Sequence, residues 1–203
     1  MKFPILASVI ILCSVIHLVT RKSSRDTENE EAAFWERERR ANSTRKKSLE
    51  HLNYIKIPFD SLPTDVLSDN PAVCEALSVL KELDKSPIVN LTGYTNTDLK
   101  LEYGTANITK LTQYDQSYTL LASTLQKWAD TLWDAGKKEE AVRVMEFSLS
   151  TQTDVSRAYY RLAEYYLSAG RKEELARLTE TAGALRSSNR EQILRHLSEF
   201  SAG

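Results

Sequence analysis

The residue types that most often do chemistry are sparse in this sequence. Its three histidines are His17, His51 and His196, and its two cysteines are Cys13 and Cys74. No two histidines have the spacing that would place both on one helical face to bind a metal, and none stands beside an obvious nucleophile. No glycine-rich phosphate loop or paired-cysteine motif occurs either. The sequence therefore predicts no enzyme activity, no metal or other cofactor and no small-molecule substrate.

The charged residues allow two further interpretations. Asp and Glu side chains could gather into a carboxylate site on folding, but helical surface charge explains them more simply. With 27 basic and 28 acidic side chains and a formal net charge of -1, the chain has no overall basic field for nucleic acid. Locally, KKEEAVR and RKEELAR mix both signs, whereas nucleic-acid binding needs a basic face. We therefore expect no nucleic-acid partner.

An apolar segment lies near the first residue. Phe3 to Thr20 is an uncharged run of eighteen residues, about 27 Å long as a helix, which nearly matches the ~30 Å hydrocarbon core. It predicts a transmembrane anchor, residues 1–20, and no Ala-x-Ala cleavage pattern follows it. A cleaved signal peptide and lipidation of Cys13 are the alternatives.

The basic residues around this segment predict its orientation. Six basic residues follow it within about twenty positions, against Lys2 before it. This asymmetry predicts a single-pass protein of the cell membrane, bound to it through residues 3–20, with its soluble part in the cytoplasm. A conventional signal anchor held by Lys2 would export that part instead.

Residues 21–50 are interpreted as a charged juxtamembrane linker. They hold nine basic and seven acidic side chains and one aromatic pair, Phe34 and Trp35. Helix formers and close opposite charges in EEAAFWERERRAN predict a solvated helix. The simple interpretation is a charged spacer. A sharper one places the aromatic pair at the lipid interface, with the basic residues of the segment on anionic headgroups.

Residues 51–110 are predicted to hold an extended strap and flanking helices. Apolar and polar residues alternate in LNYIKIPFDSLP, and its two prolines leave no room for a helix. Asn70 and Pro71 then supply a cap and a first-turn proline for a helix in which Cys74 is expected to be buried or half-buried. A short second helix is predicted to end near Gly104.

Two long segments within residues 111–203 can be overlaid. They read LQKWADTLWDAGKKEEAVRVMEFSL and YYRLAEYYLSAGRKEELARLTETAG, and Gly136 and Gly170 occupy equivalent turns 34 residues apart. This is the period of the tetratricopeptide repeat, in which each unit is a helical hairpin. The sequence therefore resembles a tetratricopeptide repeat protein over roughly residues 117–186.

Together these segments predict an all-α protein with an N-terminal transmembrane helix, a charged linker and a small domain of helical hairpins. Two repeats are fewer than the three usually needed to bury a continuous face. Apolar residues in 188–200 predict a C-terminal capping helix, and the helix from Pro71 is expected to cover the other end. The residues expected in the core are Trp128, Leu132, Val144, Leu162 and Leu178.

The family resemblance implies a concave face, formed by the first helix of each hairpin, that binds a protein or peptide. The positions concerned are Ser123, Gln126, Asp130 and Trp133 in the first repeat and Arg157, Tyr160, Glu164 and Leu167 in the second. Trp133, Arg157 and Tyr160 are types that often carry binding energy, although Trp133 and Tyr160 could instead pack under the strap or a flanking helix. Relatives that clamp a peptide carboxylate use Lys and Asn, whereas Gln126 and Asp130 stand here, so that ligand is not expected.

The chain as a whole also resembles a group of uncharacterised membrane-anchored proteins from clostridial bacteria. The similarity runs from FWERERRANSTRKK through NLTGYTNTDLKLEYG to LQKWAD and implies no activity. The combined expectation is a membrane-anchored adaptor or scaffold, without catalysis, that recruits a protein partner. The alternative is a structural subunit held permanently in a larger membrane assembly.

Overall fold

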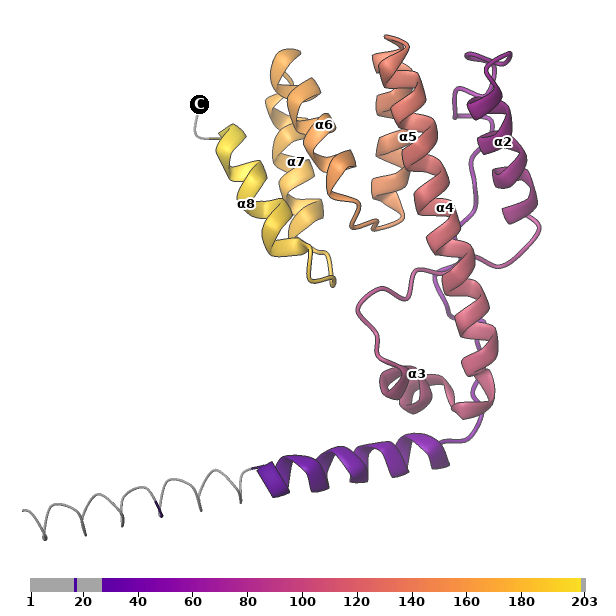
Figure 1. Cartoon of the computed structure of the whole chain (residues 1–203), viewed down its shortest axis with the longest axis vertical. Helices are drawn as coiled ribbons and strands as arrows, with labels where there is room; N and C mark the ends of the chain where they lie inside the picture. The colour runs from indigo at the N-terminus through magenta and orange to yellow at the C-terminus, as the bar shows by residue number, and fades with distance from the viewer. Residues whose placement is uncertain (1–16, 18–26, 202–203) are drawn as a thin grey trace, which may run out of the picture. The chain divides into compact units, whose positions relative to one another are not determined.

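The structure, a computed structural model, describes residue 17 and residues 27–201 (Figure 1). This part of the chain consists of helices and loops, with one isolated antiparallel bridge between Tyr54 and Val89. The all-α fold class is thereby confirmed. The predicted anchor, residues 1–20, lies outside the described residues except for His17. Among the helices that the structure describes, none has the length and apolar character needed to cross a membrane.

The chain divides into two compact units. The first contains helical residues 27–43 of the predicted linker, the stretch that follows to Lys47, and the segment Asn96–Asn107. The latter holds α3 (Asn96–Tyr103) and the 3-10 helix η1 (Thr105–Asn107). The second unit contains Ser48–Thr95 and the chain from Ile108 onward.

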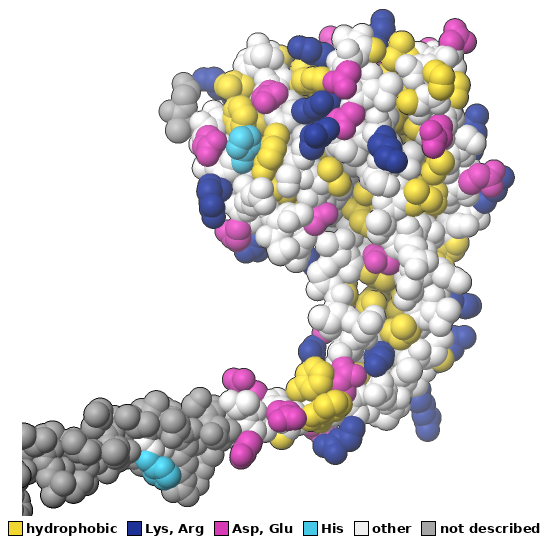
Figure 2. Space-filling model, viewed as in Figure 1, with side chains coloured by type: hydrophobic (Ala, Val, Ile, Leu, Met, Phe, Trp, Pro, Cys, Tyr) yellow, Lys and Arg dark blue, Asp and Glu magenta, His cyan; other side chains and the backbone are white. Residues whose placement is uncertain are grey.

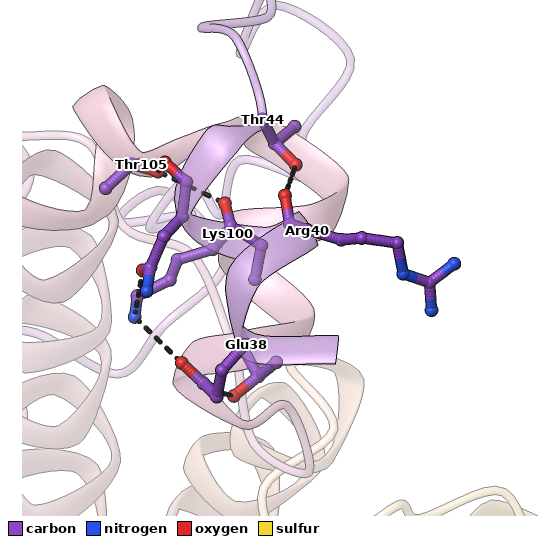
Figure 3. A network of polar contacts seen from close by, with 8 residues as sticks. Glu38, Arg40, Thr44, Lys100 and Thr105 are labelled. Atoms are coloured by element: carbon purple, nitrogen blue, oxygen red, sulfur yellow. Dashed lines mark hydrogen bonds and ion pairs between the residues drawn. The ribbon is translucent and has the colours of Figure 1, made fainter. Parts of the chain in front are cut away.

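Polar contacts join helix 27–43 to α3 within the first unit (Figure 3). The Glu38 carboxylate accepts a hydrogen bond from the Thr97 hydroxyl and lies 3.4 Å from Lys100 Nζ. The only large apolar side chain of α3 that is buried is Leu99, and the helix contributes the fully buried Ala41. Because the apolar contribution is small, the position of α3 depends on the polar groups around Glu38.

Gly104 permits a close backbone approach in the same unit. Its φ is +86°, and a Cβ at this position would lie 2.3 Å from the Arg45 carbonyl oxygen. Only glycine tolerates both conditions. Nearby, the Asn107 amide donates to the carbonyl oxygens of Lys47 and Tyr103 at 2.8 and 2.7 Å, which fixes the stretch after helix 27–43 on η1.

The second unit is a row of helical hairpins with an extra helix at each end (Figure 1). Its elements are α2 (Pro71–Leu83), α4 (Ile108–Asp134), α5 (Lys138–Ser150), α6 (Ser156–Ser168), α7 (Lys172–Gly183) and α8 (Arg190–Ser201). α4 pairs with α5 and α6 with α7, while α2 packs on α4, and α8 packs on α6 and α7. The two expected end helices are therefore present. α4 crosses the boundary predicted between residues 110 and 111 because its buried stripe already includes Leu111.

The two repeat turns have the same geometry. After α4, Gly136 has a φ of +78° and Lys137 N–H donates to the Leu132 carbonyl oxygen at 2.9 Å. After α6, Gly170 has a φ of +69° and the next amide, that of Arg171, donates five residues back at 2.8 Å. A left-handed glycine with this bond closes a helix by the Schellman motif. The 34-residue sequence repeat thus appears as two equivalent helix ends.

The core of the second unit contains the residues that the repeat pattern predicts. All five expected core residues are buried, and the strap joins them through Ile57 and Leu62, each 6% exposed. Ala129 and Ala163 are also buried, and their small side chains let paired helices approach closely. The strap has no helix, and Ile55 N–H donates to the Ile88 carbonyl oxygen at 2.9 Å.

α2 begins where the sequence predicts, but the prediction that Cys74 is buried is wrong. The Asn70 side chain accepts hydrogen bonds from the amides of Ala72 and Val73, and Pro71 occupies the first turn. The buried stripe of α2 runs through Val73, Ala76, Leu80 and Leu83. Cys74 falls beside this stripe and is exposed, so the expectation of a buried or half-buried thiol is wrong.

We predict that Gly104→Ala loosens the first unit, whereas Gly183→Ala does not. At Gly104 a side chain meets both an unfavourable φ and the Arg45 backbone, and we expect a loss of at least about 2 kcal/mol. Nothing lies within 4 Å of a Cβ at Gly183, in α7, where alanine should be neutral or stabilising by up to ~1 kcal/mol. Amide hydrogen exchange over residues 96–107 measures the difference, and equal protection in both variants would contradict it.

The first unit should also weaken in acid. The hydrogen bond from Thr97, followed by Lys100, holds the pKa of Glu38 below its ordinary value of 4.5. A carboxyl whose pKa is lowered by folding stabilises the folded state above 4.5, and this contribution is lost as the pH falls through the lowered value.

Amide protection of α3, corrected for intrinsic exchange rates, should therefore fall on acidification below about 4.5. Glu38→Gln should lower protection at neutral pH and remove this pH dependence. Glu36→Gln is the control, because Glu36 bonds only to Arg39 of its own helix among the described contacts. Retention of the full pH dependence in Glu38→Gln would show that another group is responsible.

Candidate protein interaction surface

Asp130 on α4 is the centre of a polar network that joins the two hairpins. Its Oδ1 accepts a hydrogen bond from Gln126 Nε2 at 2.9 Å and lies 2.8 Å from Arg161 Nη1. Its Oδ2 accepts one from Arg157 Nη1 at 3.1 Å. Three of the predicted binding residues, Gln126, Asp130 and Arg157, are thus brought together, and Arg161 of α6 joins them. We call these four residues the Asp130 network.

The two arginines of the network differ in exposure. The Arg157 side chain is 63% exposed, whereas those of Arg161 and Asp130 are 20% and 21% exposed. Arg161 Nη1 makes no hydrogen bond of good geometry within the described chain, so its attraction to Asp130 is chiefly Coulombic. Because solvent screens an exposed pair more strongly, the Asp130–Arg161 pair should be the stronger one.

Trp133 extends this surface toward the repeat turn. Its ring lies 5.3 Å from Arg161 Cζ and 5.4 Å from Lys138 Nζ, and it meets Tyr165 edge to face at 6.5 Å. Arg171 in turn lies 5.5 Å from the Tyr165 ring. Cation–π and aromatic contacts of this kind hold a ring in one orientation. Trp133 is therefore half-buried and held in place, with part of its surface open.

Tyr160 has a different environment, beside the closing helix. Its ring centroid lies 3.9 Å from that of His196 on α8, and His196 meets Phe200 edge to face at 5.2 Å. Both Tyr160 and Trp133 pack against the hydrophobic core. Tyr160 thus contributes to the contact between α6 and α8. From the sequence, it could have belonged either to the binding face or to a contact with a flanking helix.

The remaining predicted residues lie on exposed surface. The Ser123 hydroxyl donates to the Leu120 carbonyl oxygen of its own helix at 3.0 Å. Glu164 is exposed, and Leu167 keeps 47% of its surface accessible. None of the three joins the Asp130 network through a described contact.

Three residues that contribute to this surface are not among those predicted from the sequence. They are Arg161, Lys138 and Tyr165. Arg161 stands four residues after Arg157, so a helical projection places it next to the predicted stripe. Its contact with Trp133 of the neighbouring hairpin depends on how the hairpins pack. Lys138 and Tyr165 likewise gain their roles only through the position of the Trp133 ring.

A groove lies between α5 and α7 in the second unit. It has a volume of about 310 Å³ and is lined by Glu146, Leu149, Ser150, Tyr166, Glu174, Arg177, Leu178 and Thr181. The Tyr166 hydroxyl donates to Glu146 Oε1 at 2.7 Å, and burial raises the pKa of Tyr166 far above its ordinary value. This phenol therefore stays protonated near neutral pH and serves as a hydrogen-bond donor.

Charge is distributed without a dominant sign on the face drawn in Figure 2, where Lys and Arg side chains alternate with Asp and Glu. Within the residues described, no three His, Cys, Asp or Glu side chains gather in a way that could hold a metal ion. We call the Asp130 network together with Trp133 the Asp130 surface. It offers oriented hydrogen-bonding groups beside an aromatic ring.

We predict a stronger coupling for Asp130 with Arg161 than with Arg157. A double-mutant cycle with Asp130→Ala and Arg161→Ala should give roughly 1–2 kcal/mol, because both groups are largely shielded from water. The matched cycle with Arg157→Ala should give at most about 0.5 kcal/mol. Denaturant unfolding measures both values, and equal couplings would show that the difference in exposure has no energetic consequence.

Comparison of the chain with protein-family models, curated proteins and solved structures finds no match. The similarity to tetratricopeptide repeats stays a prediction that rests on the period and the repeat pattern. The candidate surface is therefore defined by its geometry alone. It consists of the Asp130 network and of Trp133, whose ring contacts side chains from two adjacent hairpins.

Proposed function

We propose that this chain is a single-pass membrane protein whose tetratricopeptide-like hairpins bind another protein at the cytoplasmic face, without catalysis. The observation that carries the proposal is the half-buried Trp133, whose ring contacts Arg161 and Lys138 beside the Asp130 network. Trp and Arg are the residue types that most often dominate protein interfaces.

Preorganisation is the reason why this surface suits recognition. Binding normally immobilises long side chains, which opposes association. Here the largely shielded Arg161 is already oriented by Asp130, and the Trp133 ring is oriented by two cations and Tyr165. A partner would therefore meet groups that have lost much of their freedom on folding. The exposed Leu167 adds apolar area on α6.

The membrane part of the proposal rests on the sequence. An apolar run of eighteen residues followed by six basic residues favours an anchored protein with its hairpins in the cytoplasm. An anchor would confine a bound partner to the membrane surface and so raise its local concentration.

Site-specific photo-crosslinking in the cells that make the protein tests the proposed surface. A photoreactive residue at Leu167 should give a defined adduct with a partner, because this exposed position lies on the first-helix face of α6. The matched control is Glu180, which is exposed on α7. Trp133→Ala should reduce the Leu167 adduct at least tenfold, with circular dichroism to confirm retained helicity.

Two results would contradict the proposal. Equal adducts from Leu167 and Glu180, or an adduct from Glu180 alone, would place the contact on another surface. An unchanged adduct in a folded Trp133→Ala variant would show that the Trp133 ring does not bind the partner. Loss of helicity in that variant would show that Trp133 is chiefly core, and Asp130→Asn, which preserves side-chain shape, then tests the same surface.

A further inference from the structure

Two adjacent aromatic side chains of the first unit are more than half exposed. Phe34 and Trp35 are 54% and 56% exposed, and their rings meet edge to face at 5.3 Å. Among the residues described, the exposed large apolar side chains are these two, Leu120 and Leu167, and only Phe34 and Trp35 are neighbours. Exposed aromatic surface of this kind usually marks an interaction site.

The described polar contacts within this unit involve other residues of the helix. Those between helix 27–43 and the segment 96–107 run from Arg37, which pairs with Asp98 at 2.5 Å, through Glu38 to Asn42. The aromatic pair lies before this stretch. The Trp35 indole N–H has an exposed, long bond of 3.4 Å to Glu31 of the preceding turn, so the ring remains mostly in solvent.

The surroundings of the pair fit the headgroup region of a bilayer. Arg39 stands four residues after Trp35, on the same helical face, and its side chain is 74% exposed. Aromatic rings with an apolar body and a polar edge, together with long basic side chains, are typical of membrane interfaces.

The chain can bring the pair to a membrane. The predicted membrane segment ends at Thr20, fourteen residues before Phe34. Fourteen residues span at most about 50 Å when fully extended and about 21 Å as a helix. The aromatic pair therefore lies within about 50 Å of the end of the predicted membrane segment and can reach the bilayer surface.

We propose that Phe34 and Trp35 insert into the headgroup region of the bilayer, with Arg39 on the same helical face as Trp35. This inference rests on the membrane anchorage in the proposed function, but it is independent of the Asp130 surface. It assigns a lipid contact to the first unit, whose segment 96–107 then lies at the membrane with the helix that carries the pair.

Quenching of tryptophan fluorescence by brominated lipid tests the contact. The full chain is reconstituted into phosphatidylcholine and phosphatidylglycerol vesicles, with or without bromine in the upper part of the acyl chains. The chain has three tryptophans, of which Trp128 is fully buried. Bromine should quench part of the wild-type emission. This quenching should be lost in Trp35→Phe and kept in the matched variant Trp133→Phe.

The controls separate this proposal from the anchorage on which it rests. A chain that does not float with vesicles would overturn both the anchorage and the lipid contact. Flotation with equal quenching in wild type and Trp35→Phe, or with none in wild type, would overturn the lipid contact alone. Trp35 emission that is protected from bromine but shifts with protein concentration would assign the pair to contact with a second copy, which also overturns it.

Discussion

The organisation of the second unit follows from one constraint, which is that two helical hairpins leave apolar surface open at both ends. Each hairpin buries its apolar face against a neighbour, so a short row needs terminal elements that differ from the repeat. At one end α2 packs on α4, and the strap adds the buried Ile57 and Leu62. At the other end α8 contributes Ile193 and Leu197, both 0% exposed. The non-repeating elements thus complete the core.

Closing the core also determines which part of the expected concave face stays open. The concave face expected from the repeat pattern includes residues from both first helices. α8 contacts that face at Tyr160 through His196, so this part is occupied by the protein itself. The part around Asp130 and Trp133 keeps its exposed groups. A third repeat would have preserved the whole face, whereas a single closing helix shifts the open surface toward the α4–α6 contact.

Local features were predictable from the sequence because neighbouring residues determine them. The cap at Asn70, the turns at Gly136 and Gly170, and the buried positions of the repeat all follow from short spacing rules. Features that depend on distant packing were not predictable. The approach of Gly104 to Arg45 and the position of Arg161 beside Trp133 each join segments far apart in the sequence. The error at Cys74 has an intermediate origin, since the helix was predicted correctly but Cys74 falls beside its buried stripe and not on it.

The balance of opposite charges explains why charge alone does not indicate a function for this chain. Opposite charges are nearly balanced over the chain and pair at short range in both units. Such pairs orient side chains but leave little net field to attract a partner from a distance. If the proposed surfaces bind as inferred, discrimination between partners would come from the aromatic groups. Trp133 is held by cations between two hairpins, whereas Trp35 stands on a single helix with its ring in solvent. A ring held by neighbouring side chains suits a shaped protein surface, and a ring exposed on one helix suits the lipid interface proposed for it.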